Sequence, residues 1–420
     1  MRSGAMRGFR AGAFAFFAAA LAACGGAGSS MPAPNPTGSP APHPTPTPIP
    51  TNLPSMATTV YPLPSGNEPL AGPVFASDNN LWFIESTSTG AAFVKFTATA
   101  QVPYPVPGTP IAEGATMALG SDGALWSTIQ NAGPPQSAIM ARTDTSGNVT
   151  TYPLPDATVS TMTEGSDGNL WYLAFTDQQG DAALRAFSPS SHAIVANLAL
   201  SASMLGQASA PGGLVLFTNP KDGALLISTG APAGFLKISP SSSPTVNATY
   251  KTPFVNGSVG GIAAAGGTLY ATVWDSGFLS GSPTQLIALD ESTYAMSYTQ
   301  LPNQFACSPQ CFSGISIQTP LAAGPDGNLY AWTITDQGNG DPNVFPQGFL
   351  GLTPSGTVVS QSTHSFGIIY ESLGVVPDGL TAGPDGNMWA AIYNYGSTSP
   401  PAIYEFSPLH PSRVRGVHRS

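Results

Sequence analysis

Charged residues are scarce in this chain of 420 residues. Lys and Arg number 12, Asp and Glu number 22, and together they make up 8% of the sequence. A nucleic-acid-binding surface needs clustered basic residues and a coiled coil needs charged positions beside its apolar seam, so both classes are excluded. Glycine and proline, in contrast, number 47 and 43, and long helices avoid both. The composition therefore favours an all-β protein of many short strands.

A long hydrophobic run is also missing. The apolar run at residues 11–23 has 13 residues, whereas a membrane-spanning helix needs about 20. Because arginines precede the run, it predicts a secretory signal peptide over residues 1–23. Residues 21–24 (LAAC) resemble the lipobox of bacterial lipoproteins, which implies Cys24 as the lipid-attachment (palmitate) site and a lipid-anchored cell-envelope protein. Gly25 in the next position implies the outer membrane in a Gram-negative cell.

Two further segments have a composition that cannot form a core. Residues 24–56 are rich in Pro, Ser and Thr, and proline occupies every second position from Pro40 to Pro50. We expect a disordered tether there and a disordered basic tail at residues 410–420. Between them, residues 57–409 hold six basic residues and all 22 acidic ones, a formal charge of −16. This charge excludes nucleic acid and leaves cations, polar neutral ligands or basic proteins as partners.

A short motif recurs through residues 57–409. In five copies an aspartate precedes Gly or Asn and is followed by Leu or Met and an aromatic residue. The aspartates of these copies are Asp78, Asp122, Asp167, Asp326 and Asp385. Two weaker copies are assigned to residues 211–215 and 265–270. Near-regular spacing in this range indicates a repeat array.

Each repeat predicts a four-stranded blade. The Asp-Gly turn needs a positive φ, small residues precede it, and two more strands follow the Leu-aromatic strand. The last repeat lacks its outer strand, but residues 58–64 (TTVYPLP) nearly duplicate residues 150–155 and precede the first repeat. Pairing of residues 58–64 with residues 403–406 would close a ring without an open sheet edge. We therefore predict a monomeric seven-bladed β-propeller whose last blade is closed by the N-terminal strand.

The motif itself resembles a known family. The run Gly-Pro-Asp-Gly-Asn-Leu-Trp, kept with small changes at residues 324–330 and 383–389, and the Tyr-Pro-Leu-Pro outer strands resemble the virginiamycin B lyase (streptogramin lyase) family of seven-bladed propellers. The resemblance covers residues 58–408. It implies a carbon–oxygen lyase in which a histidine base and a carboxylate-bound Mg²⁺ open the ester of a cyclic depsipeptide. In that family the base lies seven residues before a turn aspartate, and a metal-binding Glu lies seven residues after it.

These positions can be read in the five clear copies. The base positions are Ala71, Ala115, Ser160, Thr319 and Asp378, and the metal positions are Glu85, Ile129, Ala174, Thr333 and Ile392. Asp378 and Glu85 are therefore the candidate catalytic residues, and Glu85 is also the candidate Mg²⁺ ligand. A carboxylate of ordinary pKa is a weak base for a proton next to a carbonyl. The sequence thus argues against the family's elimination reaction.

The remaining cysteines and histidines suggest no chemistry. Cys307 and Cys311 are separated by three residues and lack a nearby His, which fits neither a redox pair nor a zinc site. In an oxidising compartment they are expected to form a small disulfide. His192 and His364 are expected on the surface, the first in a turn between a third and an outer strand.

Three functions stay open at this point. The first is a cell-envelope lipoprotein whose propeller binds a ligand or an envelope protein, without the elimination activity. The second is a Mg²⁺-dependent lyase that uses Glu85 or Asp378 on a cyclic depsipeptide or a similar ester or carbohydrate. The third is a structural protein displayed on its tether. We favour the first, because the residues that the lyase reaction needs are missing.

Overall fold

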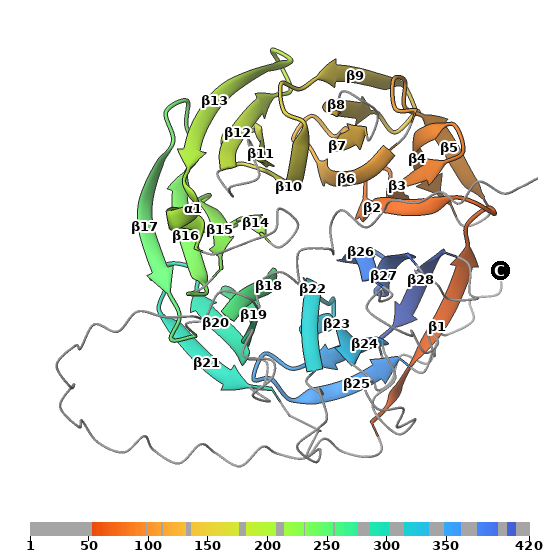
Figure 1. The fold of residues 1–420 in the computed structure, drawn as a ribbon. Helices are drawn as coiled ribbons and strands as arrows, with labels where there is room; N and C mark the ends of the chain where they lie inside the picture. Colours follow the sequence, from red (N-terminus) through yellow and green to blue (C-terminus); the bar gives the residue numbers. More distant parts are fainter. Residues whose placement is uncertain are drawn as a thin grey trace, which may run out of the picture.

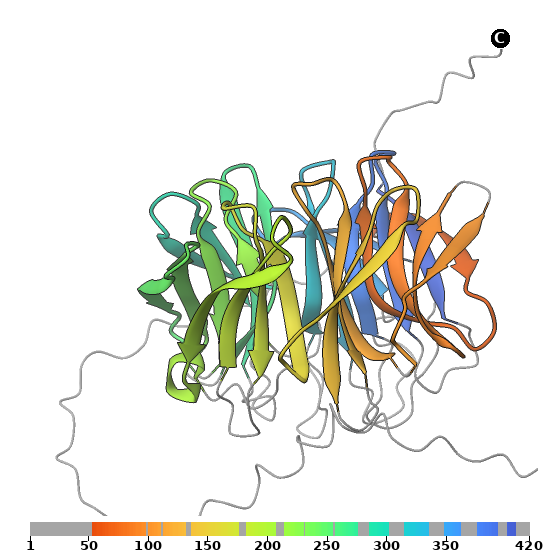
Figure 2. The same cartoon turned by 90° about the horizontal axis from the view of Figure 1, so that it is seen from above.

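The strands of this protein lie in a ring around a central axis, seen along the axis in Figure 1 and from the side in Figure 2. The computed structural model describes residues 53–97, 100–110, 112–131, 136–175, 182–206, 214–230, 232–254, 257–275, 285–301, 315–335, 348–362, 376–393 and 401–408. Within these residues, the strands form five four-stranded sheets and one eight-stranded sheet. The prediction of an all-β propeller of four-stranded sheets is confirmed. No helix of the described part is long and apolar enough to cross a membrane.

Each blade is a meander of four strands, beginning at the axis. The innermost strands are β2 (Glu68–Phe75), β6 (Ala112–Leu119), β10 (Thr158–Glu164), β14 (Leu216–Thr218), β18 (Gly257–Ala265), β22 (Ile315–Ala323) and β26 (Val376–Ala382). The second strands are β3 (Leu81–Thr87), β7 (Leu125–Asn131), β11 (Leu170–Phe175), β15 (Leu225–Thr229), β19 (Thr268–Asp275), β23 (Leu329–Thr335) and β27 (Met388–Tyr393). The first blade is thus the one that begins with β2, and the last is the one that begins with β26.

The outer half of each blade follows the same order. The third strands are β4 (Gly90–Phe96), β8 (Ser137–Thr143), β12 (Ala182–Ser188), β16 (Gly234–Ser239), β20 (Gln285–Asp290), β24 (Gly348–Leu352) and β28 (Ala402–Ser407). The outermost strands are β5 (Gln101–Pro105), β9 (Val149–Pro153), β13 (Ala193–Leu200), β17 (Thr245–Lys251), β21 (Met296–Gln300), β25 (Val358–Ser362) and β1 (Ser55–Pro62). A single turn of helix, α1 (Ala202–Leu205), follows β13.

The N-terminal strand completes the last blade, as predicted. β1 pairs antiparallel with β28, from Ala57 opposite Ser407 to Pro62 opposite Ala402. Its first two residues, Ser55 and Met56, also pair in parallel with the end of β25, a contact that the sequence analysis did not anticipate. This contact joins the last two blades into the eight-stranded sheet. The strand begins two residues before the predicted boundary at residue 57.

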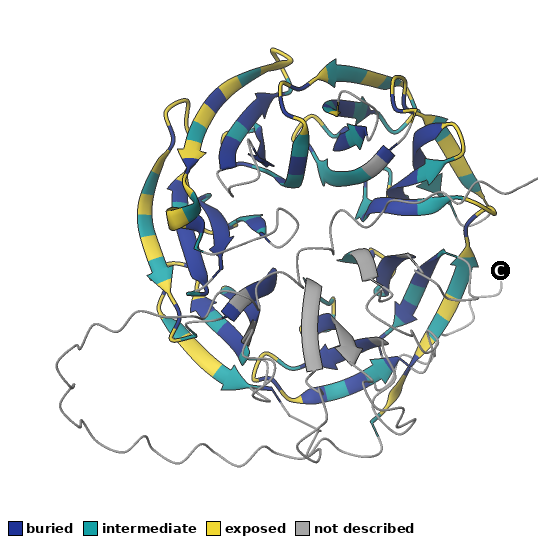
Figure 3. Ribbon diagram, viewed as in Figure 1, coloured by how far each residue is buried: buried dark blue, intermediate teal, exposed yellow. Residues whose placement is uncertain are grey.

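The core lies between neighbouring blades. In β3, Trp82 and Ile84 pack towards β7, whereas Leu81 and Phe83 pack towards Trp389 of the last blade. Both faces of a second strand are therefore covered, which explains its consecutive large apolar residues. Outer strands have a neighbour on one face, so β17 alternates between exposed and half-buried residues. Figure 3 shows the contrast between dark-blue strands in the middle of the blades, such as β3 and β11, and the banded outer strands.

One of the two weaker repeats was assigned wrongly. The prediction placed the fourth turn at residues 211–215, but the hairpin between β14 and β15 lies at residues 219–224. Asn219 N–H donates to the Ala224 carbonyl at 2.8 Å, and Gly223 has a φ of 72°. The true motif is Asp222-Gly223-Ala224-Leu225. Spacing alone missed it because Leu226 stands where other copies have an aromatic residue.

Candidate functional site

The two ends of the ring carry different kinds of residue. The turn end holds the hairpins that join each innermost strand to the second strand. The loop end is the opposite one, where innermost strands begin and second strands finish. Repeated residues lie at the turn end, and the positions assigned to the base and the metal lie towards the loop end.

The repeated aspartate organises its own turn. In the second blade, Asp122 Oδ1 accepts hydrogen bonds from Ala124 N–H at 3.0 Å and from Trp126 Nε1 at 3.1 Å. Gly120 is required because a Cβ there would overlap the Trp126 ring. Asp167 and Trp171 repeat the arrangement at 3.0 Å. The Gly-x-Asp-Gly-x-Leu-Trp motif is thus a structural clasp between turn and strand.

Basic residues of the third strands complete several clasps. Arg142 Nε lies 3.0 Å from Asp122 Oδ2, and its guanidinium carbon lies 5.7 Å from the Trp126 ring centre. Burial alone would raise the pKa of Asp122, but the hydrogen bonds from Trp126 and Ala124 and the Arg142 charge hold that pKa below its usual value. Lys95 pairs with its own turn aspartate in the same way at 2.7 Å. Arg142 and Lys95 are therefore already paired with the turn aspartates of their blades.

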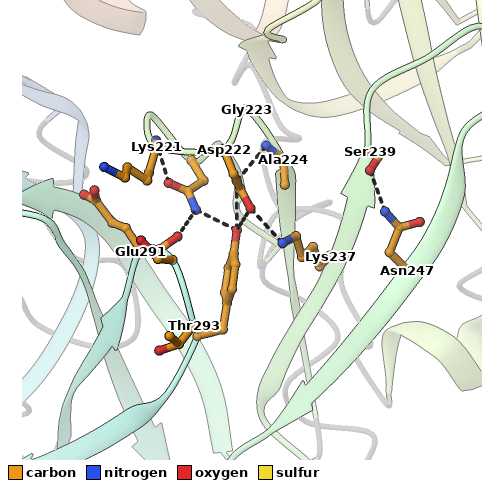
Figure 4. Close-up of polar contacts among 12 residues, drawn as sticks. Lys221, Asp222, Gly223, Ala224, Lys237, Ser239, Asn247, Glu291 and Thr293 are labelled. Carbon is orange, nitrogen blue, oxygen red and sulfur yellow. Dashed lines mark hydrogen bonds and ion pairs between the residues drawn. The ribbon is translucent and has the colours of Figure 1, made fainter.

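The fourth blade builds its clasp with a residue from the next blade. Tyr294, in the turn between β20 and β21, donates its hydroxyl to the Asp222 carboxylate at 3.0 Å and accepts from Asn219 Nδ2 at 2.6 Å. Lys237 Nζ lies 2.7 Å from Asp222 Oδ2 and 4.1 Å from the Tyr294 ring centre. Figure 4 shows Asp222 facing Lys237, with Glu291 from the neighbouring turn nearby. Tyr294 supplies the polar contact that Leu226 cannot make.

A bulge recurs in the innermost strands near the loop end. The register of β10 shifts between Val159 and Met162, and those of β22 and β26 shift at the equivalent place. The base positions Ser160, Thr319 and Asp378 lie within these bulges. Bulges redirect side chains and occur often beside active sites. The structure describes Thr319 and Asp378 as strand residues, and their side chains lie outside what it describes.

The Ser160 hydroxyl is one of several loop-end atoms that lack a partner. Ser160 Oγ and Asn131 Oδ1 are both buried and have no hydrogen-bond partner in the described part of the structure. Asn131 is 8% exposed at the end of β7, and its Nδ2 donates to the Gly108 carbonyl at 3.1 Å. Unpaired buried acceptors cost free energy unless a ligand or water satisfies them. Sequence reasoning identified Ser160 by its spacing but missed Asn131.

Glu85 is buried on β3, where alternation along the strand puts it on the same face as Leu81 and Phe83, which pack towards the last blade. It is 2% exposed, Oε1 accepts from Asn67 Nδ2 at 3.0 Å, and Oε2 has no described partner. Burial raises the pKa of Glu85, and the Asn67 hydrogen bond opposes that rise without cancelling it. A magnesium ion prefers an octahedral set of oxygen ligands and usually keeps several waters beside one or two carboxylates, and the enclosed Glu85 leaves little room for those waters. Glu85 brings one carboxylate, and no group of three His, Cys, Asp or Glu side chains gathers among the described residues. These residues do not fit the magnesium that the resemblance implies.

Several predicted residues lie outside the described residues. They are Cys24, Cys307, Cys311 and His364, so the lipid anchor and the disulfide stay predictions. His192 lies, as expected, in the exposed turn between β12 and β13, where its ring stacks on Tyr152 at 4.5 Å.

Solved structures of other proteins resemble this chain in fold. No protein-family model and no curated protein matches the chain. A streptogramin B lyase structure superposes with a TM-score of 0.55 at 18% identity, covering 84% of this chain and 97% of that one. The chain has a lyase-like propeller fold. A catalytically inactive virginiamycin B lyase from Staphylococcus aureus with quinupristin gives a TM-score of 0.56 at 15% identity, covering 84% and 100%.

The lyase-like fold is shared with propellers of other kinds. The WD40 repeats of RRP9 give a TM-score of 0.50 at 10% identity and cover 83% of this chain and 99% of that one. At such identities the similarity describes the fold, and the residues must decide the chemistry.

Proposed function

We propose that this protein is a lipid-anchored cell-envelope protein whose propeller binds a ligand or an envelope partner at its loop end, without the lyase elimination. The observation that carries the proposal is the content of the loop end. It holds buried acceptors that have no partner among the described residues, Ser160 Oγ and Asn131 Oδ1, and no histidine at any base position of the five clear repeats. Acceptors of this kind favour a ligand that donates hydrogen bonds.

Glu85, at the position assigned to the metal ligand, supports the same conclusion. Glu85 is almost fully enclosed at the seam between blades, so a substrate carbonyl has no direct approach to it. Removing a proton next to a carbonyl needs a base of suitable pKa within hydrogen-bond reach of that proton. Ala71, in the same blade as Glu85, has no proton-accepting group.

A turnover assay tests the chemical half of the proposal. Quinupristin is incubated with the protein, with and without Mg²⁺, and the linear product, an isomer of the substrate, is separated by liquid chromatography and identified by its fragments in tandem mass spectrometry, with the Staphylococcus aureus lyase as positive control. We expect no product above the enzyme-free rate. Magnesium-dependent product that disappears in Glu85→Gln would establish the lyase alternative instead.

Photo-cross-linking in intact cells tests the binding half. A photoreactive amino acid replaces Gln136 at the loop end or Ser146 at the turn end, both exposed and both beside β8. We expect discrete adducts with an envelope component from position 136 and none from position 146. Absence of adducts from both positions would favour the structural alternative.

The anchor has its own test. Labelled palmitate is expected to enter the wild-type protein and to be absent from Cys24→Ser. Fractionation is expected to move the variant out of the membrane fraction, and an unchanged distribution would contradict the anchor.

A further inference from the structure

A groove of about 490 Å³ lies on the rim of the ring, between the end of β1 and the turn after β4. Its walls include Tyr61, Leu63, Phe96 and Gln101, together with the exposed Pro62 and Pro64. The Tyr61 and Phe96 rings meet edge to face at 4.9 Å, and both are half-buried. Trp389 stacks under Tyr61 at 5.8 Å and holds this ring in place.

The groove is neutral on a strongly acidic body. None of the residues that line it is charged, although residues 57–409 carry a formal charge of −16. The Gln101 amide donates to the Pro62 carbonyl at 3.2 Å and the Tyr61 hydroxyl donates to Glu405 at 2.7 Å, so the groove offers a ligand its aromatic rings. Aromatic-lined grooves bind proline-rich segments in polyproline conformation.

We propose that residues 40–46 of this chain, the proline-rich part of its own N-terminal segment, dock in this rim groove. Residues 40–46 read PAPHPTP and contain no Asp, Glu, Lys or Arg. Proline at every second position of a helix with three residues per turn places prolines on all its sides in succession. The segment therefore presents prolines to the groove in any rotation about its axis.

The length of chain fits this placement. Leu53 packs against the core near β25 and fixes the point where the N-terminal segment leaves the ring. Six residues of β1 separate Ser55 from Tyr61, a distance of about 20 Å at roughly 3.3 Å per residue. A polyproline helix advances about 3.1 Å per residue, so about seven residues return along β1 to the groove. Counting seven back from Leu53 gives residue 46.

Docking changes the reach of the propeller. If Cys24 is the anchor, as proposed above, the free segment between anchor and propeller shortens from residues 24–52 to residues 24–39. In extended polyproline geometry this shortens the reach from about 90 Å to about 50 Å. The rim groove thus holds the ring close to the membrane and sets which side of the rim faces it.

Site-directed cross-linking on the full-length protein in detergent tests the proposal. A photoreactive residue replaces Gln101 in the groove or, as a control, Val195, which is 41% exposed on the outer strand of the third blade. Peptide mapping is expected to show cross-links from position 101 to residues 40–46, at least about tenfold above position 195, because a short linker gives a millimolar effective concentration. Cross-links from position 101 to other segments only, or none, would overturn the proposal.

Further variants test whether the groove is needed for the cross-link and whether residues 40–46 are the segment that binds. Ala100→Trp fills the exposed edge of the groove and is expected to lower the cross-link about tenfold, whereas Ala193→Trp, at an equally exposed alanine, leaves it unchanged. Replacing the four prolines of residues 40–46 by serine alters no residue of the propeller and is expected to abolish the cross-link. Cross-linked dimers instead of monomers would mean that a second copy supplies the segment, which rejects docking within one chain.

Discussion

Truncation of Met56 tests whether the start of β1 belongs to the propeller. From composition, residue 56 falls in the tether, where a substitution should have no effect. In the structure Met56 is 0% exposed and packs in a core cluster with Phe349 and Phe406, where the last two blades meet. The two views predict different stabilities for Met56→Ala.

The expected loss follows from the burial. Truncation of a fully buried methionine to alanine costs about 2–5 kcal/mol, because apolar contacts disappear and a cavity remains. For domains of about 150–250 residues each kcal/mol lowers the melting temperature by about 2–4 °C, and a larger ring lies at the low end of that range. We therefore expect Met56→Ala to melt about 4–10 °C below the wild type.

The assay is thermal unfolding followed by circular dichroism, with a methionine control. Met204 is 43% exposed in α1, so Met204→Ala should change stability by less than about 0.5 kcal/mol and the melting temperature by less than about 2 °C. Equal melting temperatures for the two variants would refute the role assigned to Met56 and to the contact between β1 and β25.

Other perturbations address the closure, the cross-blade clasp and the buried acid. Deleting residues 58–64 is expected to abolish cooperative unfolding, and an unchanged melting temperature would count against closure. Tyr294→Phe should cost about 1–3 kcal/mol because the buried Asn219 amide loses an acceptor, whereas Tyr298→Phe, at a residue 38% exposed, should cost little. Burial raises the pKa of Glu85 above 4.5, so the folded protein loses stability relative to Glu85→Gln as the pH rises through the raised pKa. Melting curves at about pH 4 and pH 7 measure this difference, and a pH-independent difference would show that Glu85 titrates normally.

The repeat made the ring predictable because its residues act locally. Asp122 and Trp126 are close in sequence and hydrogen-bonded to each other, and Gly123 bonds to Gly120 within the same turn, so each copy of the motif reports one hairpin. Tyr61 was identified as an outer-strand residue because its neighbours copy those of Tyr152. In the structure both rings stack on the tryptophan of their blade, at 5.8 and 6.0 Å. β1 therefore makes the same tyrosine–tryptophan contact in the last blade that β9 makes in the second blade, although β1 comes from the other end of the sequence.

The errors arose where a contact joins distant parts of the chain. The clasp of the fourth blade uses Asp222 and Tyr294, which are 72 residues apart, and no local pattern indicates that pair. The pairing of Met56 with β25 likewise depends on how two blades meet at the rim. Spacing placed Glu85 at the metal position, but spacing does not show that its side chain is 2% exposed and bonded to Asn67, which lies between β1 and β2.

The two ends of the ring differ in the free-energy cost of binding a ligand. At the turn end, Asp167 already accepts bonds from Asn169 and Trp171, so a ligand there would have to displace bonds that stabilise the turn. Leaving the buried Trp171 N–H without its partner costs about 1–3 kcal/mol. At the loop end, a ligand that donates to Ser160 Oγ or Asn131 Oδ1 gains bonds that the described part of the chain does not make. The same free-energy argument that fixes the motif at one end therefore leaves the other end available for recognition.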